Sequence, residues 1–210
     1  MPPQTGGWPA SGRLATRSRD HGAETPEEID RLVPLPSTPG FLDSDSNDGK
    51  QDLGAALLRE YGDVLYPVRM VSAPLWGCYE LWGFEAMMVK IATRPDLVEH
   101  ACRRFLALGL HQVRLSAALG AVGIWIEDCL TDLIHPDAFA ALNAPFLSRL
   151  VEQIHALGLG AIHYFCGNPA GKWDQIIGIG ADALALEESK KGFLIDIPGR
   201  IMNPASPRSR

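Results

Sequence analysis

The sequence predicts an α/β fold in which parallel strands alternate with helices. Short apolar runs bounded by glycine, proline or acidic residues are typical of buried strands, and they alternate with longer segments of helical apolar spacing. This order implies parallel strands joined by right-handed crossovers. The pattern fits an open doubly wound sheet or a (β/α)8 barrel, which differ in their number of strands.

The first predicted elements follow residue 51. Apolar residues recur at helical spacing over 52–61, and Gly62 can take the positive φ that ends a helix. Residues 68–73 are β-branched and apolar and predict a strand. A helix is expected within 75–91.

A long amphipathic helix is predicted over 95–119, because Pro95 fits its first turn and apolar residues recur along one face. The run 121–126 is continuously apolar, as in a strand buried on both faces. Helical spacing returns over 136–157.

The alternation then continues with a strand over 160–165, a short helix over 173–179 and a strand over 181–186. About four strands can be recognised in this way. A complete barrel has eight strands and typically about 250 residues. If the fold is a barrel, about half of its strands are present.

Both ends of the chain differ from this domain, which we place over residues 51–197. Residues 1–50 are rich in Gly, Pro, Ser and Asp and predict a loose, disordered lead-in. Within them the segment 29–36 is expected to lie as an extended strip, since its prolines disfavour a helix. Residues 198–210 have no apolar period and predict a disordered tail.

Composition narrows the classes of partner. The net charge of -6 and the pI near 5.5 provide no long basic face, which argues against nucleic acid or an anionic membrane as partner and favours a small-molecule substrate. No apolar run is long enough to span a bilayer. The four cysteines are widely spaced and no secretory signal is visible, so reduced thiols in the cytoplasm are expected.

Candidate site residues follow the predicted strands, because active sites of parallel α/β domains form at the carboxyl ends of the strands. Glu127 and Asp128 follow the second strand. Adjacent side chains on a strand point to opposite faces, so at most one of them is expected to face a site as general acid, general base or orienting group. A capped, solvated loop is the alternative.

A thiol and an imidazole end the third strand, in the segment His163-Tyr164-Phe165-Cys166-Gly167-Asn168. Both groups are ligands that zinc prefers, and a catalytic zinc needs only three protein ligands. Packing of the thiol in the core is the alternative, and a nucleophilic Cys166 is a third reading. After the fourth strand, Glu187-Glu188-Ser189-Lys190-Lys191 is either functional or a solvated charge cluster.

Several motifs occur in a characteristic order between residues 53 and 197. They are Gly83-Phe84-Glu85, Arg94-Pro95-Asp96-Leu97-Val98, Ile126-Glu127-Asp128, Leu133-Ile134-His135-Pro136-Asp137, Cys166-Gly167-Asn168, Gly180-Ala181-Asp182-Ala183-Leu184 and Glu187-Glu188-Ser189-Lys190-Lys191-Gly192-Phe193. In this order they resemble the uroporphyrinogen decarboxylase superfamily. That superfamily also contains zinc-dependent methyltransferases, which move methyl groups between corrinoid proteins and thiols.

The resemblance implies a (β/α)8 barrel and, in the methyltransferase branch, a zinc bound by a His and a Cys one residue apart and by a distant Cys. Cys166 matches the first cysteine of this pattern, whereas Tyr164 occupies the histidine position and His163 lies one residue earlier. On a regular strand His163 and Cys166 would point to opposite faces. The distant cysteine would fall beyond residue 197.

The leading hypothesis is a methyltransferase-like enzyme of this family that acts on a thiol or on a corrinoid methyl group. The resemblance suggests Asp128, Glu187 and Tyr164 as catalytic residues, Cys166 and His163 as zinc ligands, and a corrinoid carried on a partner protein. Uroporphyrinogen decarboxylase activity in porphyrin biosynthesis is the alternative, although no arginine-rich substrate loop precedes the domain. A truncated, inactive fragment is the third reading, and its exposed strand edges would favour aggregation or dimerisation.

Overall fold

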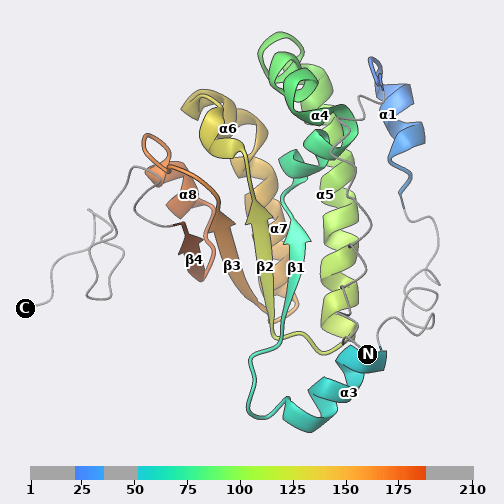
Figure 1. Cartoon of the computed structure of the whole chain (residues 1–210), viewed down its shortest axis with the longest axis vertical. Helices are drawn as coiled ribbons and strands as arrows, with labels where there is room; N and C mark the ends of the chain where they lie inside the picture. Colours follow the sequence, from blue (N-terminus) through green and yellow to red (C-terminus); the bar gives the residue numbers. More distant parts are fainter. Residues whose placement is uncertain (1–21, 36–51, 188–210) are drawn as a thin grey trace, which may run out of the picture.

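A single parallel sheet organises the protein in its computed structural model, which describes residues 22–35 and 52–187. Its strands are β1 (Val68–Ser72), β2 (Gly123–Asp128), β3 (Gly160–Phe165) and β4 (Ala183–Leu186), in the spatial order β1-β2-β3-β4 (Figure 1). All three pairings are parallel, which confirms the predicted α/β class and the four predicted strands. The predictions for 1–21, 36–51 and 188–210 lie outside the described residues.

The helices between the strands agree with the predicted alternation. They are α4 (Pro74–Thr93), α5 (Pro95–Ala118), α6 (Pro136–Leu142), α7 (Ala144–Ala156) and α8 (Trp173–Gly178), with a 3-10 turn at Thr131–Leu133. One predicted helix over 136–157 is in fact two, because the backbone leaves helical geometry at Asn143. Pro145 in the first turn of α7 suits a new helix start, since the amide that proline lacks needs no partner there.

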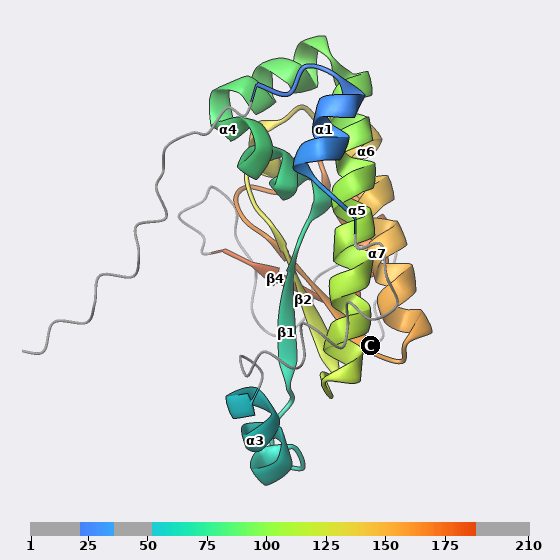
Figure 2. The same ribbon diagram turned by 90° about the vertical axis from the view of Figure 1, so that its right-hand side faces the viewer.

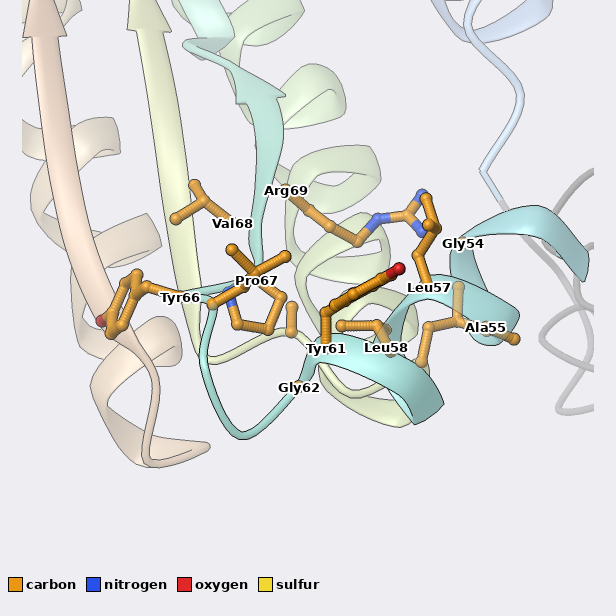
Figure 3. Close-up of a pocket in the computed structure, with 13 residues that line it drawn as sticks. Gly54, Ala55, Leu57, Leu58, Tyr61, Gly62, Tyr66, Pro67, Val68 and Arg69 are labelled. Carbon is orange, nitrogen blue, oxygen red and sulfur yellow. The ribbon is translucent and has the colours of Figure 1, made fainter.

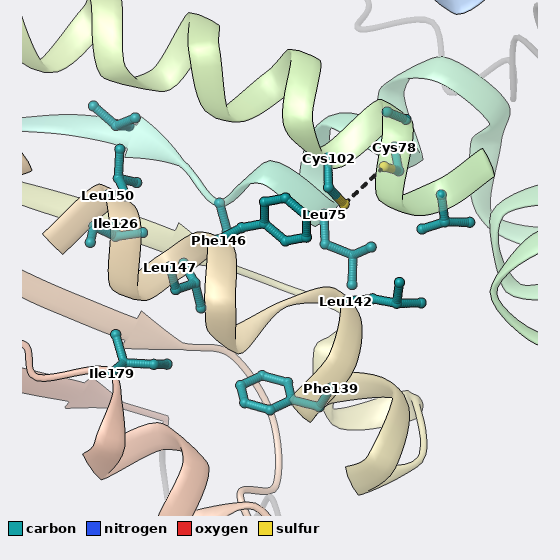
Figure 4. Packing of buried hydrophobic residues seen from close by; sticks show 14 of the residues in the cluster. Leu75, Cys78, Cys102, Ile126, Phe139, Leu142, Phe146, Leu147, Leu150 and Ile179 are labelled. Carbon is teal, nitrogen blue, oxygen red and sulfur yellow. Dashed lines mark hydrogen bonds between the residues drawn. The ribbon is translucent and has the colours of Figure 1, made fainter. Parts of the chain in front are cut away.

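The core lies between the sheet and its helices. Helices α5 and α7 run along one face of the sheet (Figure 2). Burial alternates along β2, where Ile124 and Ile126 are fully buried and Trp125 between them is partly exposed. Around Ile126, side chains of α6 and α7 such as Phe139 and Leu147 fill the space beneath the sheet (Figure 4).

The opposite face of the sheet, here called the open face, is not covered by any described helix. Met70 on β1 is 62% exposed there. The pairing Met70↔Trp125↔Ile162 shows that these side chains form one row across the sheet, because paired residues in a parallel sheet point the same way. In a closed barrel such a row would face the interior.

Helix α1 (Pro26–Leu32) corrects the extended strip expected over 29–36. Its start is favourable because Pro26 occupies the first helical turn, while the Thr25 side chain and Glu28 form a capping box. Ile29 is fully buried, and the Trp82 indole N–H donates to the carbonyl of Ala23 at 2.9 Å. The prolines fail to prevent a helix here because they lie at its start and beyond its end.

Helix α3 (Asp52–Tyr61) was predicted correctly but has no buried residue. It leaves a cavity of about 380 Å³ beside the start of β1, lined mainly by apolar side chains (Figure 3). This cavity lies at the amino end of the strand, away from the edge where a site is expected. None of the described helices combines the length and the apolar character needed to cross a bilayer.

Candidate active site at the carboxyl ends of the strands

The ends of β2 and β3 lie side by side, with Asp128 opposite Phe165. The amide of Cys166, the residue after β3, donates to the carbonyl of Asp128 at 2.9 Å, so the hydrogen bonding between the two strands reaches the end of both. Cys129 and Cys166 are therefore neighbours across the end of the sheet. Two of the three predicted site segments meet here because parallel strands bring their carboxyl ends to one edge.

Side-chain alternation divides the candidate residues between two faces. Asp128 and His163 are both 0% exposed on the helix-covered face. Glu127 and Tyr164, which pair in register, are partly exposed on the open face. Only one of the two adjacent carboxylates thus reaches the open face, as expected from the strand geometry.

Four side chains meet on the open face and are here called the thiol cluster: Cys129, Tyr164, Cys166 and Glu187. The Tyr164 hydroxyl donates to Glu187 Oε1 at 3.4 Å. Cys166 interacts with all three other members. Together with Glu127, whose Oε1 lies 3.8 Å from the Cys129 sulfur, they place two thiols, a phenol and two carboxylates at the strand ends.

The electrostatics of the thiol cluster favour protonated groups. Burial raises the pKa of the Cys166 thiol, and the Glu187 carboxylate raises it further, whereas hydrogen bonds from Cys129 and Tyr164 lower it. Burial likewise raises the pKa of Cys129 and of Tyr164 well above the ordinary values.

A second polar group lies on the covered face and is here called the buried network: Asp128, Asn143 and His163. The Asn143 amide donates to Asp128 Oδ1 and Oδ2 at 3.1 and 3.0 Å, and His163 Nε2 is hydrogen-bonded to Asp128 Oδ2 at 3.0 Å. His163 Nδ1 is buried and has no hydrogen-bond partner among the described residues. These bonds compensate the burial of the Asp128 carboxyl group.

The loop after Cys166 depends on Gly167. Its φ of 115° lies in the region that favours glycine, and a Cβ atom there would collide with the carboxyl group of Asp132. Asn168 continues the turn by accepting from the amide of Ala170 at 2.9 Å. Lys172 reaches back to the carbonyl of Asp132 at 3.1 Å, and burial lowers the pKa of this amine.

The structure brings together Tyr164, Cys166 and Glu187 among the residues predicted from sequence, and it separates them from Asp128 and His163. A zinc site built on both His163 and Cys166 does not fit this arrangement, because the two side chains lie on opposite faces. No group of three or more His, Cys, Asp or Glu side chains suited to a metal occurs in 22–35 and 52–187.

Sequence reasoning missed Cys129 and Asn143 as members of these clusters. Cys129 could have been found by extending the strand register one residue beyond Asp128. Asn143 offered no such signal, because it lies between two helices and reaches Asp128 only through the packing of α6 and α7 on the sheet.

Known proteins resemble this chain in their sequence profile and in their fold. The uroporphyrinogen decarboxylase (URO-D) family profile matches residues 57–192. No curated protein matches the chain. The solved structure of a methyltransferase from Methanosarcina mazei is similar with a TM-score of 0.59 and 20% identity, over 66% of this chain and 40% of that one.

The chain therefore spans about two fifths of the methyltransferase that it resembles. At this level of identity the likeness concerns the fold alone. It identifies the four-stranded parallel sheet with its helices as part of a (β/α)8-type barrel, in agreement with the expectation of a partial barrel.

Proposed function

Because the chain belongs to the uroporphyrinogen decarboxylase family, we propose that it acts as a methyltransferase of this family, moving a methyl group between a corrinoid and a thiol. The observation that supports this activity most directly is the position of Cys166. Its sulfur lies at the carboxyl edge of the sheet, within the Cys-Gly-Asn motif, and contacts a second thiol, a phenol and a carboxylate. Sulfur-rich sites suit thiol chemistry and soft metal ions.

Glu187 and Tyr164 act in this proposal on the proton of an incoming thiol. The Glu187 carboxylate accepts that proton, and the Tyr164 hydroxyl, donating at 3.4 Å, orients the carboxylate. The substrate sulfur then forms a bond to the methyl carbon while the bond from that carbon to its donor breaks. The corrinoid is the methyl donor in this direction and is carried by a partner protein.

Asp128 and His163 have a positioning role in this proposal. Both are fully buried on the face away from Cys166 and are hydrogen-bonded to each other. They fix the ends of β2 and β3, and hence the spacing of Cys129 and Cys166. Neither side chain contacts a substrate that is bound on the open face.

Zinc dependence is implied for the methyltransferase branch, but the described residues do not form a three-ligand zinc site. Cys166 remains the residue that we propose as its ligand. Metal analysis tests this part separately: any zinc that the chain binds is expected to be lost in Cys166→Ala, and zinc retained by that variant would contradict the ligand role.

Methyl transfer is favoured over decarboxylation by the surroundings of the thiol cluster. A tetrapyrrole with several carboxylates needs cationic side chains to bind it. Six described arginines make side-chain contacts within helices, between helices or with the α1 segment: Arg31, Arg94, Arg103, Arg104, Arg114 and Arg149. None of these contacts joins the thiol cluster.

The test is an assay with methylcobalamin as methyl donor and 2-mercaptoethanol as acceptor, followed by the absorbance change of the demethylated corrinoid. We expect turnover by the 210-residue chain and its loss in Cys166→Ser. Cys102→Ser is the matched control, because the Cys102 thiol is fully buried against Cys78 and is not a member of the thiol cluster. Unchanged turnover in Cys166→Ser, or coproporphyrinogen formation from uroporphyrinogen, would contradict the proposal.

A further inference from the structure

We propose that Cys129 and Cys166 form an oxidisable pair, which a hydroperoxide converts into a disulfide that joins the ends of β2 and β3. The two residues are neighbours because each directly follows a member of the last β2–β3 pair, Asp128↔Phe165, and the amide of Cys166 donates to the carbonyl of Asp128 at 2.9 Å. Adjacent strands lie about 4.8 Å apart. A disulfide needs Cα atoms roughly 4.4–6.8 Å apart, so this position satisfies the backbone requirement.

A disulfide also requires both side chains to lie on the same face of the sheet, and these two side chains do. Cys166 contacts Tyr164 and Glu187 of the thiol cluster on the open face, and Cys129 lies next to Glu127 on the same face. The two thiols are close enough that each influences the pKa of the other. A sulfur–sulfur bond therefore joins two side chains that already lie on the same face of neighbouring strand ends.

Solvent exposure distinguishes Cys129 and Cys166 from the other neighbouring thiols, Cys78 and Cys102. Cys129 and Cys166 are each partly exposed. Cys78 and Cys102, between α4 and α5, have sulfurs 3.6 Å apart but are 0% exposed (Figure 4). Proximity alone would favour disulfide formation in both pairs. A dissolved oxidant, however, reacts only with the pair that it can reach.

The reaction balances with one hydroperoxide per disulfide. A thiol sulfur takes one peroxide oxygen as the O–O bond breaks, giving a sulfenic acid and one molecule of water or alcohol. The second thiol then displaces that oxygen as water and forms the S–S bond. The pair loses two protons and two electrons, and the peroxide takes up both to give water and one further molecule of water or alcohol.

The disulfide would remove the Cys166 sulfur from the open face as a free thiol. Loss of methyl transfer upon oxidation rests on the proposed function, but formation of the disulfide does not. A link that forms without any effect on turnover would contradict the proposed function and leave this inference standing.

The experiment treats the native 210-residue chain with excess hydrogen peroxide, blocks the remaining thiols by alkylation and maps the peptides without reduction by mass spectrometry. We expect a peptide pair joined through Cys129 and Cys166 that is separated by dithiothreitol. Cys78 and Cys102 should be recovered alkylated after unfolding, which makes them an internal control. Absence of the Cys129–Cys166 link, or linkage of Cys78 to Cys102 first, would overturn the inference.

A Cys129→Ser variant provides the matched test. Without the second thiol, Cys166 is expected to accumulate as sulfenic and then sulfinic acid under the same treatment. Circular dichroism first establishes that the variant folds. Recovery of unmodified Cys166 in this variant would show that the oxidant does not reach the site, and this result also overturns the inference.

Discussion

At the scale of single residues, the adjacent acids Glu127 and Asp128 on β2 lie in different environments. Asp128 is enclosed beneath the sheet with Asn143 and His163, whereas Glu127 lies on the open face. The difference arises from the side-chain alternation of a strand rather than from the chemistry of either residue. A carboxyl group enclosed in this way depends on each of its hydrogen-bond partners.

We predict that Asn143→Ala lowers the free energy of unfolding by about 2 kcal/mol, because it removes both donors that Asn143 supplies to Asp128. Urea denaturation followed by circular dichroism measures the change. Gln112→Ala on the exposed side of α5 is the control and should change stability by less than about 0.5 kcal/mol. Equal effects of the two substitutions would show that the network contributes nothing specific.

Gly167 provides a second prediction at this scale. Gly167→Ala should destabilise the protein by about 1–3 kcal/mol, because it combines a φ of 115° with a collision against Asp132. It should also lower methyl-transfer turnover, since Cys166 is the preceding residue. Thermal unfolding and the methylcobalamin assay measure the two effects.

Two other glycines serve to distinguish the effect of backbone strain from the effect of the collision with Asp132. Gly180 has a φ of 85° but no atom near its missing Cβ, so Gly180→Ala should cost about 1 kcal/mol for backbone strain alone. Gly178 ends α8 without a positive φ or a nearby atom, and Gly178→Ala should have little effect. If Gly167→Ala and Gly180→Ala lower the free energy of unfolding equally, the collision with Asp132 contributes nothing to the effect at Gly167.

At the scale of elements, the connection from α8 to β4 is fixed by one carboxylate. Asp182 Oδ2 accepts from the amide of Ala161 at 2.7 Å and lies 2.9 Å from His155 Nε2. These contacts tie the start of β4 to β3 and α7. The Ala161 amide, followed by His155, holds the pKa of Asp182 below its ordinary value.

The lowered pKa gives a definite pH dependence. A carboxyl group with a lower pKa in the folded state adds stability above its unfolded pKa of about 3.9 and loses that contribution as the pH falls through the folded value. We predict that Asp182→Asn is less stable than the wild type at pH 7 and that the difference shrinks below about pH 4. Urea denaturation at a series of acidic pH values measures the stability difference between Asp182→Asn and the wild type. A difference independent of pH would contradict the stabilising role of the Asp182 carboxylate.

At the scale of the whole molecule, the open face and α3 leave many apolar side chains in solvent. The exposed residues near β1 are Leu53, Leu57, Tyr61, Val64, Leu65, Tyr66, Val68 and Met70. Exposed apolar surface on this scale favours association, and β1 is an edge strand whose outer side has no described partner.

We predict concentration-dependent self-association of the 210-residue chain, measured by sedimentation velocity. Met70→Lys should shift the distribution toward the monomer, because it places a charge in the exposed row of the open face. Val89→Lys on α4 is the control, since Val89 is 59% exposed but lies outside this surface. A wild-type chain that stays monomeric at every concentration would contradict the prediction.

The alternation of strands and helices could be predicted because it depends on local apolar periodicity and on the positions of glycine and proline. Two errors have local causes as well: Pro34 follows the end of α1 rather than interrupting it, and Asn143 with Pro145 divides one predicted helix into two. The importance of the carboxyl edge followed from the parallel order of the strands. Cys166 was identified through its motif and its position after β3.

The sequence by itself therefore determined the elements, their parallel order and the candidate residues after each strand. Only the tertiary structure decided which of these residues meet. The register places Cys129 beside Cys166, and the two faces of the sheet separate Asp128 and His163 from the thiol cluster. The physical reason is that periodicity is a property of neighbours along the chain, whereas register and contacts across the sheet depend on how distant segments pack.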